Sequence, residues 1–214
     1  MAPPSLWIIG AAIRVKVCGV TSVADAVACV EAGADLLGVN FVASSPRRID
    51  PASARQIIDA IRGRAEVVGV VAGWPEARLR RLREDVGLDW LQLHGDEPPA
   101  LLEALAPLAF KALRLGDADD AADAARYGGE LLLLDAKVAG KLGGTGQTVD
   151  ATLAAPIART RRVLLAGGLC PENVATAVRA VRPWGVDVAS GVESRTGVKD
   201  LAKVAAFVQN AKRA

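Results

Sequence analysis

The sequence predicts a single-domain (β/α)8 barrel, and three observations lead to this fold class. Eight short apolar runs of strand length follow one another along the 214 residues, separated by amphipathic segments. Strands that are apolar on both faces and alternate with helices form parallel sheets covered by helices. The first strand is followed by Cys18-Gly19-Val20-Thr21, which lacks the Gly-x-Gly-x-x-Gly pattern of an open dinucleotide-binding sheet. We expect the barrel to span residues 14–214, after a short N-terminal extension of residues 1–13.

The eight expected strands are Arg14–Val20, Asp35–Phe41, Glu66–Val71, Asp89–Leu93, Leu108–Arg114, Glu130–Asp135, Arg162–Ala166 and Gly185–Ala189. Each is a mostly apolar run, and no long insertion separates one unit from the next. The chain length is near the lower end for a closed barrel of eight units, so the loops must be short.

Six segments between or after these runs have a helical pattern: Ser22–Ala32, Pro51–Arg62, Pro75–Val86, Pro98–Leu105, Pro171–Val181 and Val198–Ala211. Ser22 suits a helix cap. Pro51, Pro75 and Pro171 suit a first helical turn, where a missing N–H costs nothing. Gly87 stands where a helix should stop.

Composition narrows the class of protein. Apolar residues make up 51% of the chain and charged residues 23%, which describes a soluble globular protein with a sizeable core. A net charge of +2 gives no reason to expect a nucleic-acid partner, and no run has the length of a membrane span. The three cysteines, Cys18, Cys29 and Cys170, have unrelated spacings that fit neither a metal motif nor a disulfide framework. We therefore expect reduced thiols in the cytoplasm.

The ends of the last two strands predict a phosphate site. Ala166-Gly167-Gly168 closes the seventh strand, and Ala189-Ser190-Gly191 closes the eighth. Small residues let a backbone approach a ligand, and N–H groups at the start of the next turn bind anions. In barrels of this kind, the loops after strands seven and eight are the usual phosphate site. We expect a phosphorylated substrate.

Active sites of such barrels lie at the carboxyl ends of the strands. The polar candidates there are Lys16, Cys18, Asn40, Arg47, His94, Lys111, Arg114, Asp135, Asp187 and Ser190. An inward-facing cysteine is either a small core residue or a reactive thiol, so Cys18 alone decides nothing. Asp135 follows four leucines that deliver its carboxyl to the barrel mouth, where it acts in catalysis, caps a loop or pairs with Lys137.

Three further features bear on the site. The glycine-rich segment 137–146 is expected to be a mobile lid that excludes water from a bound substrate. His94 is the only histidine, which excludes a histidine-rich metal site but leaves a role in orienting substrate. Arg47 is either a solvated loop residue or, if its planar fork turns inward, a partner for a substrate carboxylate.

An ordered set of motifs runs from about Arg14 to the C-terminus: Lys16-Val17-Cys18-Gly19-Val20-Thr21, Ser45-Pro46-Arg47, Gln92-Leu93-His94-Gly95-Asp96-Glu97, Gly143-Gly144-Thr145-Gly146, Ala166-Gly167-Gly168-Leu169, Pro171-Glu172-Asn173-Val174 and Val186-Asp187-Val188-Ala189-Ser190-Gly191-Val192-Glu193. Each motif alone is modest, but in this order the set resembles phosphoribosylanthranilate isomerase, a barrel enzyme of tryptophan biosynthesis.

The resemblance implies an aldose–ketose isomerase. It would convert N-(5-phosphoribosyl)anthranilate to 1-(2-carboxyphenylamino)-1-deoxyribulose 5-phosphate, an Amadori rearrangement that uses no metal and no organic cofactor. By this resemblance, Asp135 is the general acid that opens the ribose ring, and Cys18 is the general base that removes the proton from C2. The implied substrate-binding residues are Arg47, at the anthranilate carboxylate, His94 and Asp187. The implied phosphate-binding residues are Gly144, Gly167, Gly168, Ser190 and Gly191.

Two alternatives stay open at this stage. One is another phosphosugar isomerase or epimerase on the same barrel, although such enzymes generally need paired aspartates or metal-binding histidines. The other is a non-catalytic phosphate-binding barrel or a domain of a multienzyme complex, which the presence of both Cys18 and Asp135 disfavours. For the isomerase that the motifs resemble, the expected partner is a small phosphosugar substrate, and we expect a monomer or a homodimer.

Overall fold

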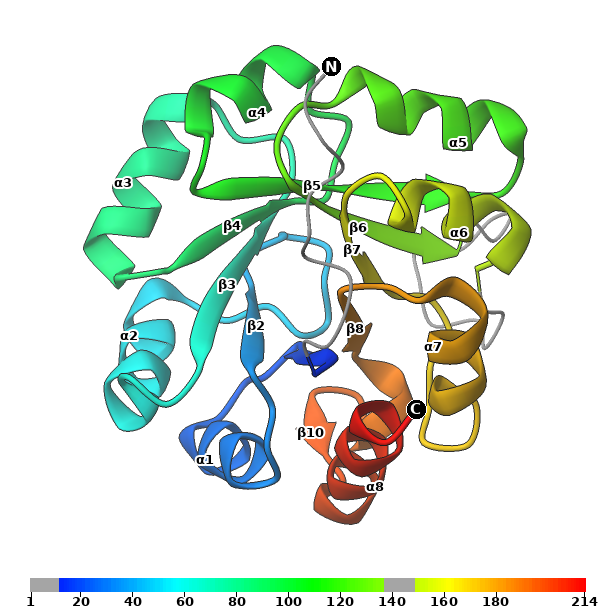
Figure 1. The fold of residues 1–214 in the computed structure, drawn as a ribbon. Helices are drawn as coiled ribbons and strands as arrows, with labels where there is room; N and C mark the ends of the chain where they lie inside the picture. Colours follow the sequence, from blue (N-terminus) through cyan, green and yellow to red (C-terminus); the bar gives the residue numbers. More distant parts are fainter. Residues whose placement is uncertain (1–11, 137–148) are drawn as a thin grey trace.

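Eight parallel strands form a closed barrel in the order β1-β2-β3-β4-β5-β6-β7-β8, which confirms the predicted fold class. The structure is a computed structural model that describes residues 12–136 and 149–214. Helices surround the central strands, and the C-terminal helix lies beside the first one, so that the ring of helices also closes (Figure 1). The predicted extension, except Ala12 and Ile13, and the predicted lid lie outside the described residues.

The strands are β1 Arg14–Cys18, β2 Leu36–Asn40, β3 Glu66–Val71, β4 Trp90–Leu93, β5 Ala109–Leu115, β6 Leu131–Ala136, β7 Arg162–Leu165 and β8 Gly185–Val188. All eight expected strands form, with ends that differ by at most two residues. β1 pairs with β2 on one side and with β8 on the other, so Lys16 lies opposite both Leu36 and Asp187. This register places the first and last strands of the chain side by side.

The helices are α1 Val23–Glu31, α2 Pro51–Ile61, α3 Glu76–Val86, α4 Pro99–Leu105, α5 Ala118–Asp123, α6 Ala151–Ala158, α7 Val174–Val181 and α8 Leu201–Lys212. The Ser22 hydroxyl accepts a hydrogen bond from Asp25 N, as a helix cap should. Pro51 opens α2 behind an Asp50 cap, and Gly87 ends α3 at a φ of 80°. The short α5 and the proline-containing α6 have no strong pattern and were not among the expected helices.

Two expected helix starts are wrong. α7 begins at Val174 rather than at Pro171, because the Asn173 side chain bonds Cys170 N and Gly168 O and holds residues 171–173 in a turn. Residues 198–199 are extended, not helical, and α8 follows an Asp200 cap. They form β10 (Val198–Lys199), which pairs antiparallel with β9 (Glu193–Arg195). A 3-10 helix, η3 (Ser190–Val192), joins β8 to this hairpin.

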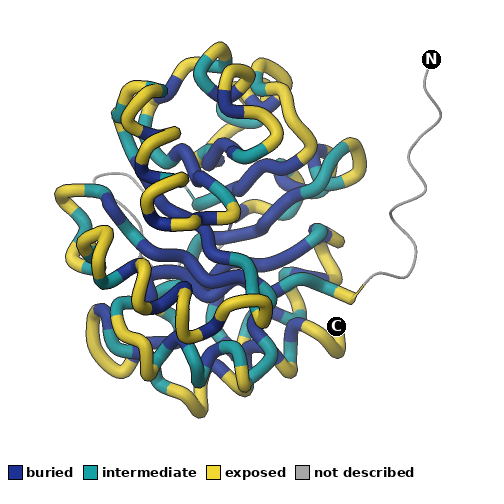
Figure 2. Tube along the Cα trace, turned by 90° about the vertical axis from the view of Figure 1, so that its left-hand side faces the viewer, coloured by how far each residue is buried: buried dark blue, intermediate teal, exposed yellow. Residues whose placement is uncertain are grey.

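The core consists of two groups of apolar side chains. The larger one fills the space between strands and helices, as the dark strands beneath the exposed helix faces in Figure 2 illustrate. The smaller one, which includes Leu36, Val68, Phe110 and Leu133, fills the interior of the barrel. Among the described helices, none combines the length and the apolar character that a membrane crossing needs.

Candidate active site

The neighbouring strands β1 and β8 place a buried ion pair inside the barrel. Lys16 and Asp187 lie opposite each other in register, and the Lys16 ammonium is 2.8 Å from Asp187 Oδ1. The Lys16 side chain is completely buried. Burial lowers the pKa of Lys16, but the Asp187 carboxylate and the nearby Cys18 outweigh it, so that the pKa is raised above its ordinary value. Lys16 is therefore a fixed positive charge beside the candidate base.

Cys18 is the last residue of β1, and its thiol is buried at the carboxyl end of the strand. Gly38 on β2 makes room for it, since a Cβ at that position would lie 2.7 Å from Cys18 Sγ. Burial raises the pKa of Cys18, against the opposing effect of the Lys16 and Lys199 ammonium groups. Lys16 thus favours the thiolate but does not overcome the effect of desolvation.

Asp135 lies near the end of β6, separated from β1 by β7 and β8. Its side chain is 17% exposed. Burial, together with the Asp187 charge, raises the pKa of Asp135 to about 6, although Arg114 and Lys16 oppose the shift. A carboxyl with such a pKa still carries its proton in part of the molecules near neutral pH, which suits a proton donor.

His94 directly follows β4 and lies beside Asp135. Its Nε2 is 4.0 Å from Asp135 Oδ2, and its Nδ1 is 2.8 Å from Gln92 Nε2. With Gln92 Nε2 as the donor, Nδ1 accepts and the ring proton lies on Nε2, on the side of Asp135. Burial and the surrounding cations lower the pKa of His94 to about 4. His94 is therefore a neutral hydrogen-bond donor at the barrel mouth.

This assignment makes a first testable prediction. We expect the imidazole of His94 to titrate with a midpoint of about 4, more than two units below an exposed histidine. Since the chain contains one histidine, NMR of the imidazole reports this residue without ambiguity. Asp135→Asn serves as a control, because removal of a nearby anion should not raise the midpoint. A midpoint between 6 and 7 would show that the ring is solvated and charged below neutral pH.

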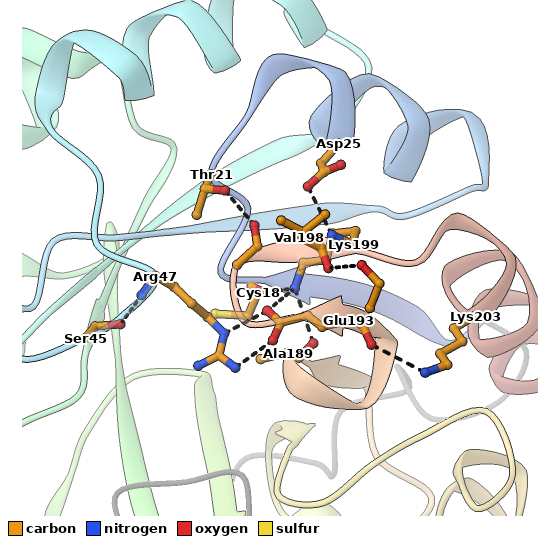
Figure 3. Close-up of polar contacts among 12 residues, drawn as sticks. Cys18, Thr21, Asp25, Ser45, Arg47, Ala189, Glu193, Val198, Lys199 and Lys203 are labelled. Carbon is orange, nitrogen blue, oxygen red and sulfur yellow. Dashed lines mark hydrogen bonds and ion pairs between the residues drawn. The ribbon is translucent and has the colours of Figure 1, made fainter.

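Arg47 turns inward, but its guanidinium already has a partner. Arg47 Nε and Nη2 each donate to one oxygen of Glu193 at 2.7 Å, in a bidentate ion pair (Figure 3). The arginine lies across the end of β1 at Gly19, where a Cβ would be 2.3 Å from Arg47 Cδ. The other edge of the guanidinium, formed by Nη1 and Nη2, has no partner within residues 12–136 and 149–214. A ligand carboxylate can bind at this edge.

In the two predicted phosphate loops, after β7 and β8, glycines leave the backbone N–H groups open to close approach by a phosphate. Gly167 and Gly168 after β7 both have positive φ, at 80° and 61°. Ser190 and Gly191 open η3 after β8, and a Cβ on Gly191 would lie 2.0 Å from Leu169 O in the β7 loop. The loops after β7 and β8 are thus packed against each other at Gly191. Gly144, the remaining predicted phosphate ligand, lies outside the described residues.

Two of the strand-end candidates, Lys111 and Asn40, have structural roles. The Lys111 ammonium is buried and donates to Leu93 O, Gly95 O and Glu97, so it holds the loop after β4. Asn40 Oδ1 accepts from Val42 N and closes a turn. A third candidate, Arg114, is exposed, and its charge lowers the pKa of both Asp135 and His94. No group of three or more histidine, cysteine or acidic side chains that could hold a metal occurs among the described residues.

Two buried charged residues beside Cys18 are not among the expected site residues. Glu193 and Lys199 stand in the short segment after the eighth strand, where a charge pattern normally indicates a solvated loop. Only the pairing of β9 with β10 and the approach of this hairpin to β1 bury them. No local signal in the sequence distinguishes them from exposed charges.

Two surface crevices lie at the other end of the barrel. The larger one has a volume of about 460 Å³ and is lined by the amino ends of strands, including Arg14, Asp35, Glu66 and Asp89. Charged residues of both signs pair with one another there, as Arg14 does with Glu66. Since this end of such a barrel serves stability, we place the site at the opposite end.

A family model and curated relatives both relate this chain to phosphoribosylanthranilate isomerases. The sequence model of the family described as N-(5'phosphoribosyl)anthranilate (PRA) isomerase matches residues 15–210. The N-(5'-phosphoribosyl)anthranilate isomerase of Pseudomonas fluorescens (strain SBW25) is 44% identical over 200 residues, which cover 92% of this chain and 95% of that protein.

Solved structures agree with the sequence comparison. The phosphoribosyl anthranilate isomerase of Thermotoga maritima superposes with a TM-score of 0.87 at 36% identity, covering 94% of this chain and 100% of that one. Another phosphoribosyl anthranilate isomerase, crystallised with reduced 1-(o-carboxyphenylamino)-1-deoxyribulose 5-phosphate, gives a TM-score of 0.84 at 36% identity with the same coverage, 94% and 100%. The similarity extends over nearly the whole length of this chain.

Proposed function

The chain belongs to the phosphoribosylanthranilate isomerase family, and from this premise we propose which of its residues carry out the reaction. The enzyme is a phosphoribosylanthranilate isomerase of tryptophan biosynthesis. Family membership sets aside both the other phosphosugar isomerases and the non-catalytic barrel. The reaction needs a proton on the ribose ring oxygen and the loss of a proton from C2. Two groups on different sides of the sugar meet this need.

Asp135 is the general acid. Its raised pKa, about 6, keeps a usable fraction of the carboxyl protonated near neutral pH. Proton transfer to the ring oxygen opens the ribose ring and leaves a Schiff base between C1 and the anthranilate nitrogen. The Asp187 carboxylate supports the protonated form, because a second negative charge nearby disfavours ionisation. The observation that carries the proposal is the placement of a largely buried carboxyl near the end of β6 and a buried thiol at the end of β1, both at the carboxyl end of the barrel.

Cys18 is the general base. Its thiolate removes the C2 proton of the Schiff base, and the resulting enolamine tautomerises to the ketone. Since burial raises the pKa of Cys18 while Asp135 titrates at about 6, the active form, with a neutral carboxyl and a thiolate, is a minority of the free enzyme. Lys16 and Lys199 increase this minority by stabilising the negative sulfur.

Arg47, the phosphate loops and the polar groups at the mouth bind the substrate. The free edge of the Arg47 guanidinium binds the anthranilate carboxylate, and backbone N–H groups at Gly167, Gly168, Ser190 and Gly191 bind the phosphate. The neutral His94 donates from Nε2 to the substrate near Asp135, and Asp187 accepts from a sugar hydroxyl. Gly144, which lies outside the described residues, stays a predicted phosphate ligand.

The proposal includes the cellular compartment, the cofactor requirement and the oligomeric state of the enzyme. Cys18, Cys29 and Cys170 are all free thiols, which supports a reducing compartment such as the cytoplasm. The substrate is a small phosphosugar, and the reaction as written involves no metal or organic cofactor. The oligomeric state stays a prediction, monomer or homodimer.

A solvent isotope experiment tests the proton-transfer chemistry. In D2O, we expect part of the product to carry deuterium at C1, because the proton taken by the Cys18 thiolate exchanges with solvent before C1 is protonated. NMR of the product after a single passage through the enzyme measures this incorporation. Product re-isolated from D2O without enzyme is the control for spontaneous exchange. Complete retention of the substrate C2 hydrogen at C1 would contradict the expected exchange with solvent.

A further inference from the structure

The β9–β10 hairpin brings two buried charged residues to the end of β1. Glu193 and Lys199 are partners across the hairpin, and both side chains are at most 4% exposed. Figure 3 shows both residues beside Cys18, with the Glu193 carboxylate bound to the Arg47 guanidinium and to the Lys199 ammonium. Charges are rarely buried unless they are paired and hydrogen-bonded, so the two residues need an explanation that the acid–base pair does not supply.

The Lys199 ammonium has three N–H donors, and each has an acceptor. It donates to Cys18 O at 2.7 Å, to Ala189 O at 3.2 Å and to Glu193 Oε1 at 3.1 Å. Cys18 carries the candidate base, and Ala189 directly precedes the phosphate-loop residue Ser190. One cation thus ties the carboxyl end of β1 to the loop after β8.

The Glu193 carboxylate joins this cation to Arg47. Oε1 accepts from both Lys199 and Arg47 Nε, and Oε2 accepts from Arg47 Nη2. Burial raises the pKa of Glu193, but the two cations outweigh it and keep the pKa below its ordinary value. Glu193 is therefore ionised, and it fixes both the position and the rotation of the guanidinium plane.

The hairpin itself is anchored to the segment that follows β1. Thr21 Oγ1 donates to Gly197 O at 2.6 Å, and Lys199 N donates to Asp25 Oδ2 at 3.1 Å. A displacement of the hairpin would thus be transmitted to the end of β1.

A second buried lysine–glutamate pair, Lys111 and Glu97, has a purely structural role and serves as a comparison for Lys199 and Glu193. Lys111 and Glu97 lie 3.1 Å apart, and their other side-chain hydrogen bonds go to backbone groups of Leu93, Gly95 and Gly73. Within residues 12–136 and 149–214, neither side chain forms a hydrogen bond or ion pair with an arginine. Glu193 differs because it holds a side chain that the proposed mechanism places on the substrate.

We propose that Glu193 and Lys199 are a positioning pair: Glu193 orients the Arg47 guanidinium toward the substrate carboxylate, and Lys199 holds the Cys18 and Ala189 strand ends together. The inference rests on the proposed role of Arg47 and deepens it. Neither residue touches the substrate; each acts through a group that does.

A double-mutant cycle tests the Glu193 part. The variants are Glu193→Gln, Arg47→Met and the double variant. The ligands are reduced 1-(o-carboxyphenylamino)-1-deoxyribulose 5-phosphate, which has the carboxylate, and ribulose 5-phosphate, which lacks it. We expect Glu193→Gln to weaken binding of the carboxylate ligand about tenfold more than binding of ribulose 5-phosphate. In the Arg47→Met background, Glu193→Gln should have no further selective effect.

The outcomes separate this inference from the proposed function. Equal weakening of both ligands by Glu193→Gln, or an undiminished selective effect without Arg47, overturns the inference alone. An Arg47→Met variant that binds both ligands like the wild type overturns the assignment of Arg47, and the inference with it.

The proposed role of Lys199 is tested separately, by the pH at which the Cys18 thiol becomes reactive. In a background that carries both Cys29→Ala and Cys170→Ser, Cys18 is the one cysteine left in the chain, and the pH dependence of alkylation reports it. We expect Lys199→Met to move the alkylation midpoint to higher pH and to lower kcat, whereas the matched variant Lys111→Met lowers stability without moving the midpoint. An unmoved midpoint in folded Lys199→Met overturns this part. If Lys199→Met does not fold, the Glu193 cycle decides the proposal, because Glu193 joins Lys199 to Arg47.

Discussion

Replacement of Cys18 by alanine is expected to lower kcat for the isomerisation by about 10²–10⁴-fold, the usual contribution of a general base. The thiolate is the only proposed acceptor for the C2 proton, and alanine has no titratable group to replace it. The small side chain leaves a minor void beside Gly38, so the barrel should stay folded. Steady-state kinetics and circular dichroism on the same preparation measure both effects.

The other two cysteines are matched controls for this substitution. Cys170 is half-exposed after the β7 loop, and Cys170→Ser should keep near-wild-type kcat. Cys29 is buried on α1, so Cys29→Ala should cost stability but little activity. Activity of Cys18→Ala within a few-fold of the wild type would show that another group removes the proton.

Replacement of Asp135 by asparagine is expected to lower kcat strongly and to stabilise the protein above pH 6. The loss of the general acid should reduce kcat by about 10²–10⁴-fold. The carboxyl has a folded pKa of about 6, above its ordinary 3.8. Its contribution to stability is thus fully present below pH 4 and is lost as the pH rises to 6, where the buried group ionises. Asparagine does not titrate, so at pH 8 the variant should gain about 2–3 kcal/mol of unfolding free energy.

Urea unfolding at pH 4 and at pH 8 measures this difference. The variant and the wild type should differ little at pH 4 and clearly at pH 8. Asp187→Asn is a control of opposite sign, because it leaves the buried Lys16 ammonium unpaired and should destabilise the protein by about 3–5 kcal/mol. A stability gain of Asp135→Asn that is the same at both pH values would contradict the raised pKa.

The sequence predicts the barrel well because its signals are local. Each strand is a short apolar run, and a cap or a proline marks several helix starts, as at Ser22 and Pro51. Cys18 and Asp135 were identified as candidates because strand ends are recognisable and because barrel sites lie there. The start of α7 was misplaced, since the Asn173 side-chain bonds that delay the helix compete with a proline signal.

The electrostatic framework of the site was not predictable from the sequence. Glu193 and Lys199 have the charge pattern of a solvated loop, and only their approach to β1 buries them. Lys111 was expected among the strand-end candidates, yet it serves the backbone of the β4 loop. From the sequence alone, the Lys16 side chain could face either into the barrel or outward, and its register with Asp187 shows that it faces inward. Burial and pairing of charges depend on contacts between segments far apart in the chain.

The most direct test of the acid–base pair follows the fluorescence of phosphoribosylanthranilate, generated in situ, as each enzyme consumes it. The wild type, Cys18→Ala, Asp135→Asn and the double variant are compared at one pH. We expect rapid decay with the wild type and decay at least about 10²-fold slower with each single variant. The double variant should lose little more activity than either single variant, because the two groups act as a unit. Decay with either single variant within about threefold of the wild-type rate would contradict the proposed acid–base pair, since a general acid or base contributes far more.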